Sequence, residues 1–171
     1  MKLIVAKGIN GEIGAGNRLL WSLPTDMKHF RNTTMHNTVV MGMNTYRSLG
    51  MKPLPGRYNI VITKSACTYQ KKYGDVRFMT MFMFEEYFLK TLYSWMFFGD
   101  IFIIGGGQLY RKFAKSCDVL YITDVEQNYP ESDTFFEMPD GEFLEELLQS
   151  GNENGLHYCI KKYTRKGNND A

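Results

Sequence analysis

The sequence is poor in cysteine, and the few cysteines are far apart. Cys67, Cys117 and Cys159 form no C-x-x-C pair, so the sequence predicts reduced thiols and neither a zinc site nor a disulfide framework. The histidines lack cysteine or acidic partners at metal-ligand spacing. We therefore predict no metal site and interpret all three as structural or surface residues: His29, His36 and His157.

A strong charge of one sign is also missing. The formal net charge is only +2, and lysine and arginine are spread along the chain. A dedicated nucleic-acid-binding protein would show a clustered basic face, so no nucleic-acid partner is expected. Small anionic ligands remain possible, because a few local cations suffice to bind them.

Long hydrophobic runs are absent as well. The first residues, MKLIVAKGINGE, contain too short an apolar run for a signal peptide. The most hydrophobic region, 79–98, is interrupted by Glu85, Glu86 and Lys90, so it does not predict a membrane span. We expect a cytoplasmic protein with no membrane partner.

The 171 residues contain enough apolar material for one domain with a solid core, since 44% are hydrophobic. Apolar runs of strand length alternate with helical patterns, and several runs end in glycine. This alternation predicts a single α/β domain around a largely parallel sheet, with ligands at the carboxyl ends of the strands. The strands are expected at 3–6, 38–42, 59–63, 76–79, 101–104, 119–125 and 156–165. The helices are expected from Thr25 as N-cap, from Asn44 or Thr45, and over 84–97 and 108–115.

One carboxylate stands out in the stretch LWSLPTDMKHF. At helical spacing Asp26 shares a face with Phe30 and Thr33, with Met27 at its edge, whereas the opposite face is charged and polar. Asp26 could simply complement the macrodipole in a first helical turn. Alternatively, an apolar site would raise its pKa, and the carboxyl could then bind the polar edge of an amidine-like or guanidine-like ring.

Two strand ends run into glycine and then into a helix. A tight turn does not need three consecutive glycines, and this stretch has Gly105, Gly106 and Gly107. We therefore favour a phosphate-binding site at this helix start. The stretch from Gly42 to Thr45 repeats the arrangement, which suggests a dinucleotide gripped from both sides. Neither stretch is a G-x-G-x-x-G fingerprint, and the chain has no G-x-x-x-x-G-K-[ST] loop.

Two further polar residues have both a plain and a functional interpretation. Arg57 follows the turn Leu54-Pro55-Gly56. It is either a solvated side chain or, held by the rigid turn, a guanidinium that binds a carboxylate through two hydrogen bonds. Thr123 lies inside an apolar strand, where it is either an ordinary β-former or a hydroxyl serving a buried partner such as Asp26.

Taken together, these stretches resemble the dihydrofolate reductase family along nearly the whole chain. The resemblance depends on several motifs in order rather than on any one of them. The motifs are Ile13-Gly14 with Asn17, Trp21-x-Leu23-Pro24-x-Asp26-Met27-x-x-Phe30, Val40-Met41-Gly42-x-x-Thr45, Leu54-Pro55-Gly56-Arg57-x-Asn59, Ile104-Gly105-Gly106-Gly107-x-x-Tyr110, Tyr121-x-Thr123 and Ser132-Asp133-Thr134-x-Phe136.

The resemblance implies a fold and an activity. The fold would be a twisted, mostly parallel (mixed) sheet of about eight strands flanked by helices in one domain, with residues 38–99 as an adenosine-binding subdomain. The activity would be reduction of dihydrofolate with NADPH as the cofactor, inhibited by antifolates. The bond between Gly105 and Gly106 would be a cis peptide, as in the family.

The resemblance also implies roles for individual residues. Asp26 would anchor the pterin and promote its protonation, Thr123 would support that contact, and Trp21 would hold a nearby water; Tyr110 completes the catalytic set. The substrate pocket would be lined by Ile4, Val5, Ala6, Met27, Phe30, Ser48, Leu49, Leu54, Arg57, Ile104 and Thr123. The cofactor would be held by Ala6, Ile13, Asn17, Gly42, Met43, Asn44, Thr45, Ile62, Thr63, Lys64, Gly105, Gly106, Gly107, Gln108, Leu109 and Tyr110.

Lys64 is of special interest within this set. Met43 stands where bacterial members often carry an arginine for the 2′-phosphate of the cofactor, and Lys64 is the compensating candidate. We expect a monomer. Two alternatives remain at this level: a pterin or pyrimidine reductase of the riboflavin pathway, and a non-catalytic folate- or nucleotide-binding protein.

Overall fold

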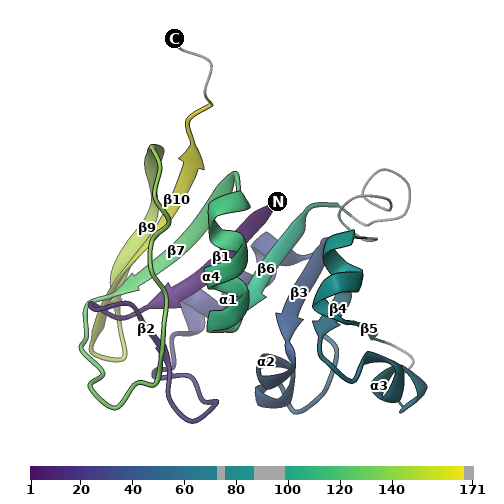
Figure 1. The fold of residues 1–171 in the computed structure, drawn as a ribbon. Coiled ribbons are helices and arrows are strands. Elements are labelled where there is room, and N and C mark those ends of the chain that lie inside the picture. Colours follow the sequence, from purple (N-terminus) through teal and green to yellow (C-terminus); the bar gives the residue numbers. More distant parts are fainter. Residues whose placement is uncertain (73–75, 87–98, 168–171) are drawn as a thin grey trace.

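The computed structural model describes residues 1–72, 76–86 and 99–167, and within these residues the chain forms an α/β fold around one large twisted sheet (Figure 1). Across the described residues this sheet has eight strands in the order β5-β4-β3-β6-β1-β7-β10-β9. Their bounds are β1 Lys2–Lys7, β3 Thr38–Gly42, β4 Tyr58–Ile62, β5 Arg77–Met79, β6 Ile101–Gly105, β7 Val119–Val125, β9 Phe143–Glu153 and β10 Leu156–Arg165.

The sheet is parallel from β5 to β7 and antiparallel beyond. Strand β1 lies between β6 and β7 and is parallel to both. Strand β10 pairs antiparallel with β7 and with β9, which forms the outer edge. The expected fold class, an α/β domain with a mixed, mostly parallel sheet of about eight strands, is confirmed.

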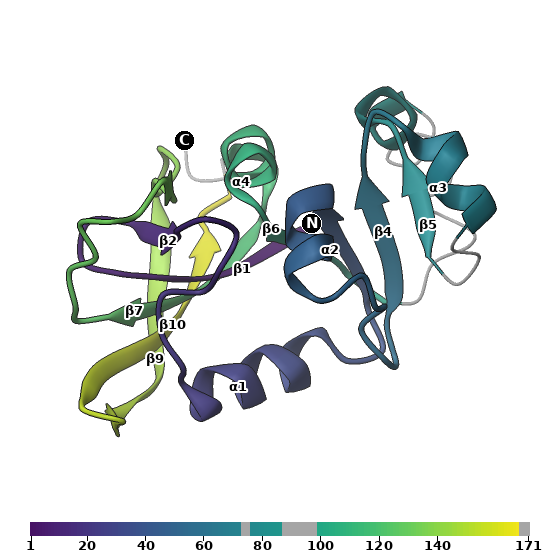
Figure 2. The same ribbon diagram turned by 90° about the horizontal axis from the view of Figure 1, so that it is seen from below.

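Helices cover both faces of the sheet. Figure 2 shows α1 (Pro24–Thr34) along one face and α4 (Gly107–Phe113) on the other. Side chains alternate along β1, so Leu3 and Val5 join the core under α4, whereas Ile4 joins the core on the opposite face. The remaining helical elements are α2 Met43–Ser48, α3 Ala66–Lys72 and the short 3-10 turn η2 Ala114–Ser116.

Several predicted boundaries were wrong or incomplete. Thr25 is not the N-cap of α1: Leu23 holds that position without a side-chain bond, and Pro24 begins the helix. The Thr25 hydroxyl and backbone N–H instead donate to the Glu153 carboxylate, at 3.2 and 2.9 Å. Positions 81–86 are helical, and the rest of the helix expected over 84–97 lies outside the described residues.

Four elements were not predicted. Strand β2 (Glu12–Gly14) pairs with β8 (Thr134–Phe135) inside what the sequence indicated as a glycine-rich loop. Helix α3 lies in a polar stretch, and β9 is mostly exposed, so neither shows a clear apolar period.

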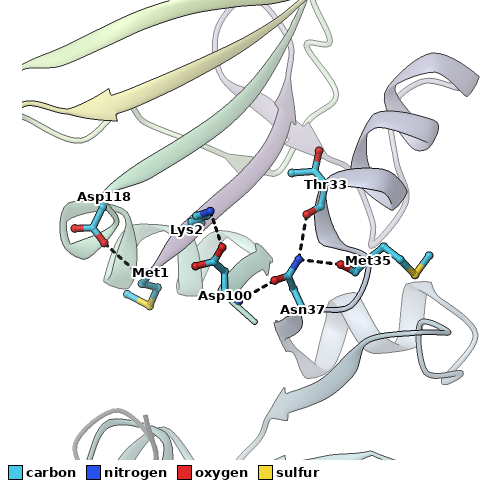
Figure 3. Close-up of polar contacts among 7 residues, drawn as sticks. All are labelled: Met1, Lys2, Thr33, Met35, Asn37, Asp100 and Asp118. Carbon is cyan, nitrogen blue, oxygen red and sulfur yellow. Dashed lines mark hydrogen bonds and ion pairs between the residues drawn. The ribbon is translucent and has the colours of Figure 1, made fainter. Parts of the chain in front are cut away.

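At the amino-terminal ends of the parallel strands, Asn37 joins three elements (Figure 3). Its Nδ2 donates to the carbonyls of Met35 at 2.9 Å and Thr33 at 3.4 Å, and its Oδ1 accepts from the backbone N–H of Asp100 at 2.7 Å. The Asp100 carboxylate is paired in turn with Lys2 at 2.6 Å. One side chain therefore ties the end of α1 to the starts of β3 and β6.

We expect Asn37→Ala to lower the free energy of unfolding by about 2 kcal/mol, because three hydrogen bonds disappear and the groups they satisfied lose their partners. Urea unfolding followed by circular dichroism measures this. Asn32→Ala, at an exposed position of α1, is the matched control and should change stability by less than about 0.5 kcal/mol. Equal midpoints for the two variants would contradict the prediction.

Candidate active site

The Asp26 carboxylate is half-buried in the first turn of α1. The Thr123 hydroxyl donates to its Oδ1 at 2.6 Å, so the contact considered for these two residues is present. Thr123 lies opposite Ala6 in the parallel pairing of β7 and β1, near the carboxyl ends of both strands. Asp26 is therefore held at the edge of the sheet where α/β folds bind ligands.

The surroundings of Asp26 favour its neutral form. Burial raises the pKa of the carboxyl, and the hydrogen bond from Thr123 opposes this only in part. The predicted helix face is largely correct, since Phe30 is half-buried and Lys28 and Arg31 are exposed. Met27, at the edge of that face, is 51% exposed.

Tyr110 reaches from α4 to the ends of the central strands. Its side chain is buried, and its hydroxyl donates to the backbone carbonyl of Ile4 at 2.9 Å. Burial, and secondly the negative charge of Asp26, raise the pKa of Tyr110 far above its usual value, so the phenol stays protonated. A Cβ added to Gly105 would lie 3.2 Å from the same hydroxyl. The Tyr110 hydroxyl thus lies next to Gly105 and the backbone of β1.

The two glycine-rich strand ends lie side by side. A Cβ added to Gly42 would lie 3.7 Å from the Gly106 nitrogen, and one added to Gly106 would lie 3.4 Å from the Thr45 Oγ1. The peptide bond between Gly105 and Gly106 is cis, as the resemblance implied. The absence of side chains here leaves the backbone open to a ligand, and the Thr45 hydroxyl is adjacent.

The guanidinium of Arg57 is held in one orientation by hydrogen bonds. Its Nε donates to the Pro55 carbonyl and one terminal nitrogen to the Thr34 hydroxyl, both at 3.1 Å, and its guanidinium lies 5.7 Å from the centre of the Phe30 ring. Burial, and secondly the charge of Arg31, lower its pKa. Among the described residues no carboxylate lies within 4.0 Å of it. A held cation without an acid partner suits an anionic ligand.

The other predicted site residues differ in their position and in how exposed their side chains are. Thr63 and Lys64 directly follow β4, beside the end of β3, and Lys64 is exposed. The side chains of Val5, Ile62 and Leu109 are part of the core, so only their backbone is available there. The remaining predicted residues are half-buried or exposed: Ala6, Ile13, Asn17, Met43, Asn44, Ser48, Leu49, Leu54, Ile104 and Gln108.

Trp21, just before α1, packs against other side chains. Its ring lies 5.2 Å from the ring of Tyr129 and packs against a small core that contains Leu23. Support from Tyr129 was not foreseen, because nothing near either residue in sequence signals the contact. Asp133 holds the loop between β2 and α1, because its carboxylate accepts a hydrogen bond from the Gly16 N–H at 2.8 Å.

The described residues give no indication of other site types. No helix among them is long and apolar enough to cross a membrane. They also contain no group of three or more histidine, cysteine or acidic side chains that could hold a metal ion. Cys67, Cys117 and Cys159 are free.

Fold and site together define a class of protein: an α/β domain in which glycine-rich strand ends and a half-buried acid lie at the carboxyl edge of the main sheet. The profile of the dihydrofolate reductase family matches residues 1–165. The chain belongs to the dihydrofolate reductase family.

Individual relatives agree with this assignment. The chain is 35% identical to dihydrofolate reductase of Haemophilus influenzae, over 78% of this chain and 76% of the relative. It is 30% identical to that of Lactococcus lactis, over 91% of each. A carrot (Daucus carota) bifunctional dihydrofolate reductase-thymidylate synthase is 34% identical over 99% of this chain, which spans only 34% of that longer protein.

A solved structure is also similar. The structure is that of dihydrofolate reductase from Enterococcus faecalis complexed with NADP(H) and RAB-propyl, with a TM-score of 0.78 and 30% identity. The match covers 97% of this chain and 96% of the other. These findings support the dihydrofolate reductase interpretation over the riboflavin-pathway reductase and the non-catalytic binding protein.

Proposed function

We propose that this protein is an NADPH-dependent dihydrofolate reductase, which converts 7,8-dihydrofolate to 5,6,7,8-tetrahydrofolate for one-carbon metabolism and for thymidylate and purine synthesis. The observation that carries the proposal is the half-buried Asp26, bonded by Thr123, at the edge where two glycine-rich strand ends meet. Membership in the dihydrofolate reductase family supports the same activity.

The residues present fit the cofactor. Gly42 and Gly106 leave a cradle that two Cβ atoms would fill, and Thr45 adds a hydroxyl at a helix start. When bound, NADPH supplies the hydride. Its pyrophosphate and nearby groups would be held by Gly42, Thr45, Gly106, Gly107, Gln108 and Leu109. Residues 38–99 would form the adenosine-binding subdomain.

The substrate would be held at two ends. Asp26 would bind the amino-pyrimidine edge of the pterin, and Arg57 would pair with the α-carboxylate of the glutamate tail. The raised pKa of Asp26 keeps a larger neutral fraction near pH 7 than a solvated aspartate would have. Asp26, or a water beside Trp21, would pass the proton to the ring nitrogen. The loop from Gly14 to Leu20 would exclude water during the reaction.

The same proposal includes the setting of the enzyme. It would act as a cytoplasmic monomer, without nucleic-acid or membrane partners, and would be a target for antifolates that occupy the pterin pocket.

The direct test is turnover. Purified protein mixed with NADPH and dihydrofolate should consume the cofactor, followed by its absorbance, and a tight-binding antifolate should stop the reaction. A protein without turnover from acidic to alkaline pH would not be a dihydrofolate reductase.

Cofactor preference gives a separate prediction. Because Lys64 is exposed directly after β4, Lys64→Ala should weaken NADPH roughly tenfold through the lost 2′-phosphate contact and leave NADH nearly unchanged. Fluorescence titration of both cofactors measures this, with Lys52→Ala, another exposed lysine, as the control. Equal losses for NADPH and NADH would show that Lys64 does not recognise the 2′-phosphate.

A further inference from the structure

Glu12 is an acid that the mechanism above does not use. It lies in β2, at the start of the loop that leads to Trp21, and its side chain is only 1% exposed. Among the described residues, no lysine or arginine lies within 4.0 Å of its carboxylate. A buried charge without a cation is costly unless hydrogen bonds satisfy it.

Those hydrogen bonds come from two separate segments. The Oε2 atom accepts from the Asn10 backbone N–H at 2.7 Å, and Oε1 accepts from Asn10 Nδ2 at 3.1 Å and from the Tyr129 backbone N–H at 3.2 Å. Burial alone would raise the pKa of Glu12, but these bonds outweigh it and hold the pKa below its usual value. The carboxylate is therefore ionised and accepts from both segments.

The surrounding backbone closes tightly on this carboxylate. A Cβ added to Gly8 would lie 2.6 Å from Glu12 Oε2, so only glycine fits beside it. Asn10 Nδ2 also donates to Asn128 Oδ1 at 3.0 Å, which adds a second link to the segment that carries Tyr129. The Tyr129 ring in turn packs on Trp21, 5.2 Å away.

We propose that Glu12 is a positioning residue: its carboxylate fixes the Asn10 loop to the Tyr129 backbone, so that the Tyr129 ring holds Trp21 next to the start of the helix that carries Asp26. Trp21 and Leu23, the N-cap of that helix, pack in the same small core. The inference rests on the proposed reductase function and adds a residue that acts on the site without touching it.

The chemistry of the three acceptor contacts gives a sharp test. In Glu12→Gln one carboxylate oxygen becomes an NH₂ group, which must face an N–H donor of Asn10 or Tyr129. The isosteric variant should therefore lower kcat about tenfold and leave the dissociation constant of NADPH nearly unchanged. Glu137→Gln, an exposed acid in the following segment, is the matched control and should behave as wild type.

Trp21 itself provides the signature. The chain has 2 tryptophans, so Trp95→Phe in every variant leaves Trp21 as the single emitter. Glu12→Gln and, independently, Tyr129→Leu should shift its emission to longer wavelength, because the tyrosine ring no longer covers it. Tyr129→Leu keeps the backbone N–H that Glu12 binds, so it tests the last link even if Glu12→Gln does not fold.

The outcomes separate the hypotheses. If both residues act through one chain of contacts, the double variant should have the kcat of the worse single variant. The proposal is overturned if Glu12→Gln lowers the melting temperature while kcat and emission match Glu137→Gln, or if Tyr129→Leu changes neither. Absence of turnover in the wild type would refute the reductase function alone, because the emission shift does not depend on turnover.

Discussion

Asp26→Asn is expected to retain the fold and NADPH binding but to lose roughly 100-fold or more of kcat at neutral pH, the usual contribution of a positioned acid. The asparagine keeps the size of the side chain and can accept from the Thr123 hydroxyl, so packing at this position should survive. Single-turnover measurements over a range of pH are the appropriate test. In the wild type the rate should fall as pH rises through the raised pKa of Asp26, and in the variant that inflection should be missing.

The same substitution should not destabilise the protein. The folded-state pKa of Asp26 is raised, so the folded chain binds the proton more tightly than the unfolded chain. Its contribution to stability is therefore present at low pH and lost as pH rises through the folded pKa. At neutral pH the neutral asparagine should give a melting temperature equal to or above that of wild type. Asp140→Asn, which changes an exposed acid, is the control. If Asp26→Asn has the same rate as the wild type, Asp26 only stabilises the start of its helix.

Arg57→Leu is expected to raise the KM for dihydrofolate about 100-fold and to change kcat much less. The guanidinium is already held by Pro55 and Thr34, so a carboxylate can bind it without ordering a flexible side chain. Removing one partner of such a charge pair typically costs 2–5 kcal/mol, roughly 30-fold or more in affinity. Steady-state kinetics with varied dihydrofolate measure the effect.

A truncated substrate isolates the contact. Dihydropteroate lacks the glutamate, so Arg57→Leu should leave its KM nearly unchanged. Arg77→Leu, an exposed arginine at the start of β5, controls for the loss of one positive charge. A similar rise in KM for both substrates would mean that Arg57 shapes the pocket instead of binding the carboxylate.

The central elements could be predicted because they carry strong local signals. β1, β3 and β6 are short apolar runs followed by glycine or a polar residue, and each lies within one residue of its expected bounds. Strand β9 could not be predicted, since its sequence FLEELLQ is rich in helix-forming residues and most of its side chains are exposed. It is a strand because its backbone pairs with β10, and the local sequence of β9 does not predict this pairing.

In the candidate site, too, some residues carry a local sequence signal and others are placed only by long-range contacts. Asp26 and Thr123 could be noticed because each is a polar residue within an apolar pattern, and the structure joins them across 97 positions. Glu12 gave no such signal, because it lies among glycines and polar residues that indicate a loop. Its burial depends on the backbone of Tyr129, 117 positions away, so only the folded chain reveals it.

The position of β1 has a consequence for how the protein is made. Both neighbours of β1 in the sheet, β6 and β7, begin only at Ile101 and Val119, and the acceptor for the Thr25 N–H is Glu153. During synthesis this interior strand of the sheet therefore emerges first and waits for about a hundred residues without its partners. Long-range parallel pairing of this kind slows folding and leaves apolar segments open to aggregation. The nascent chain should therefore depend on chaperones most strongly before β6 emerges.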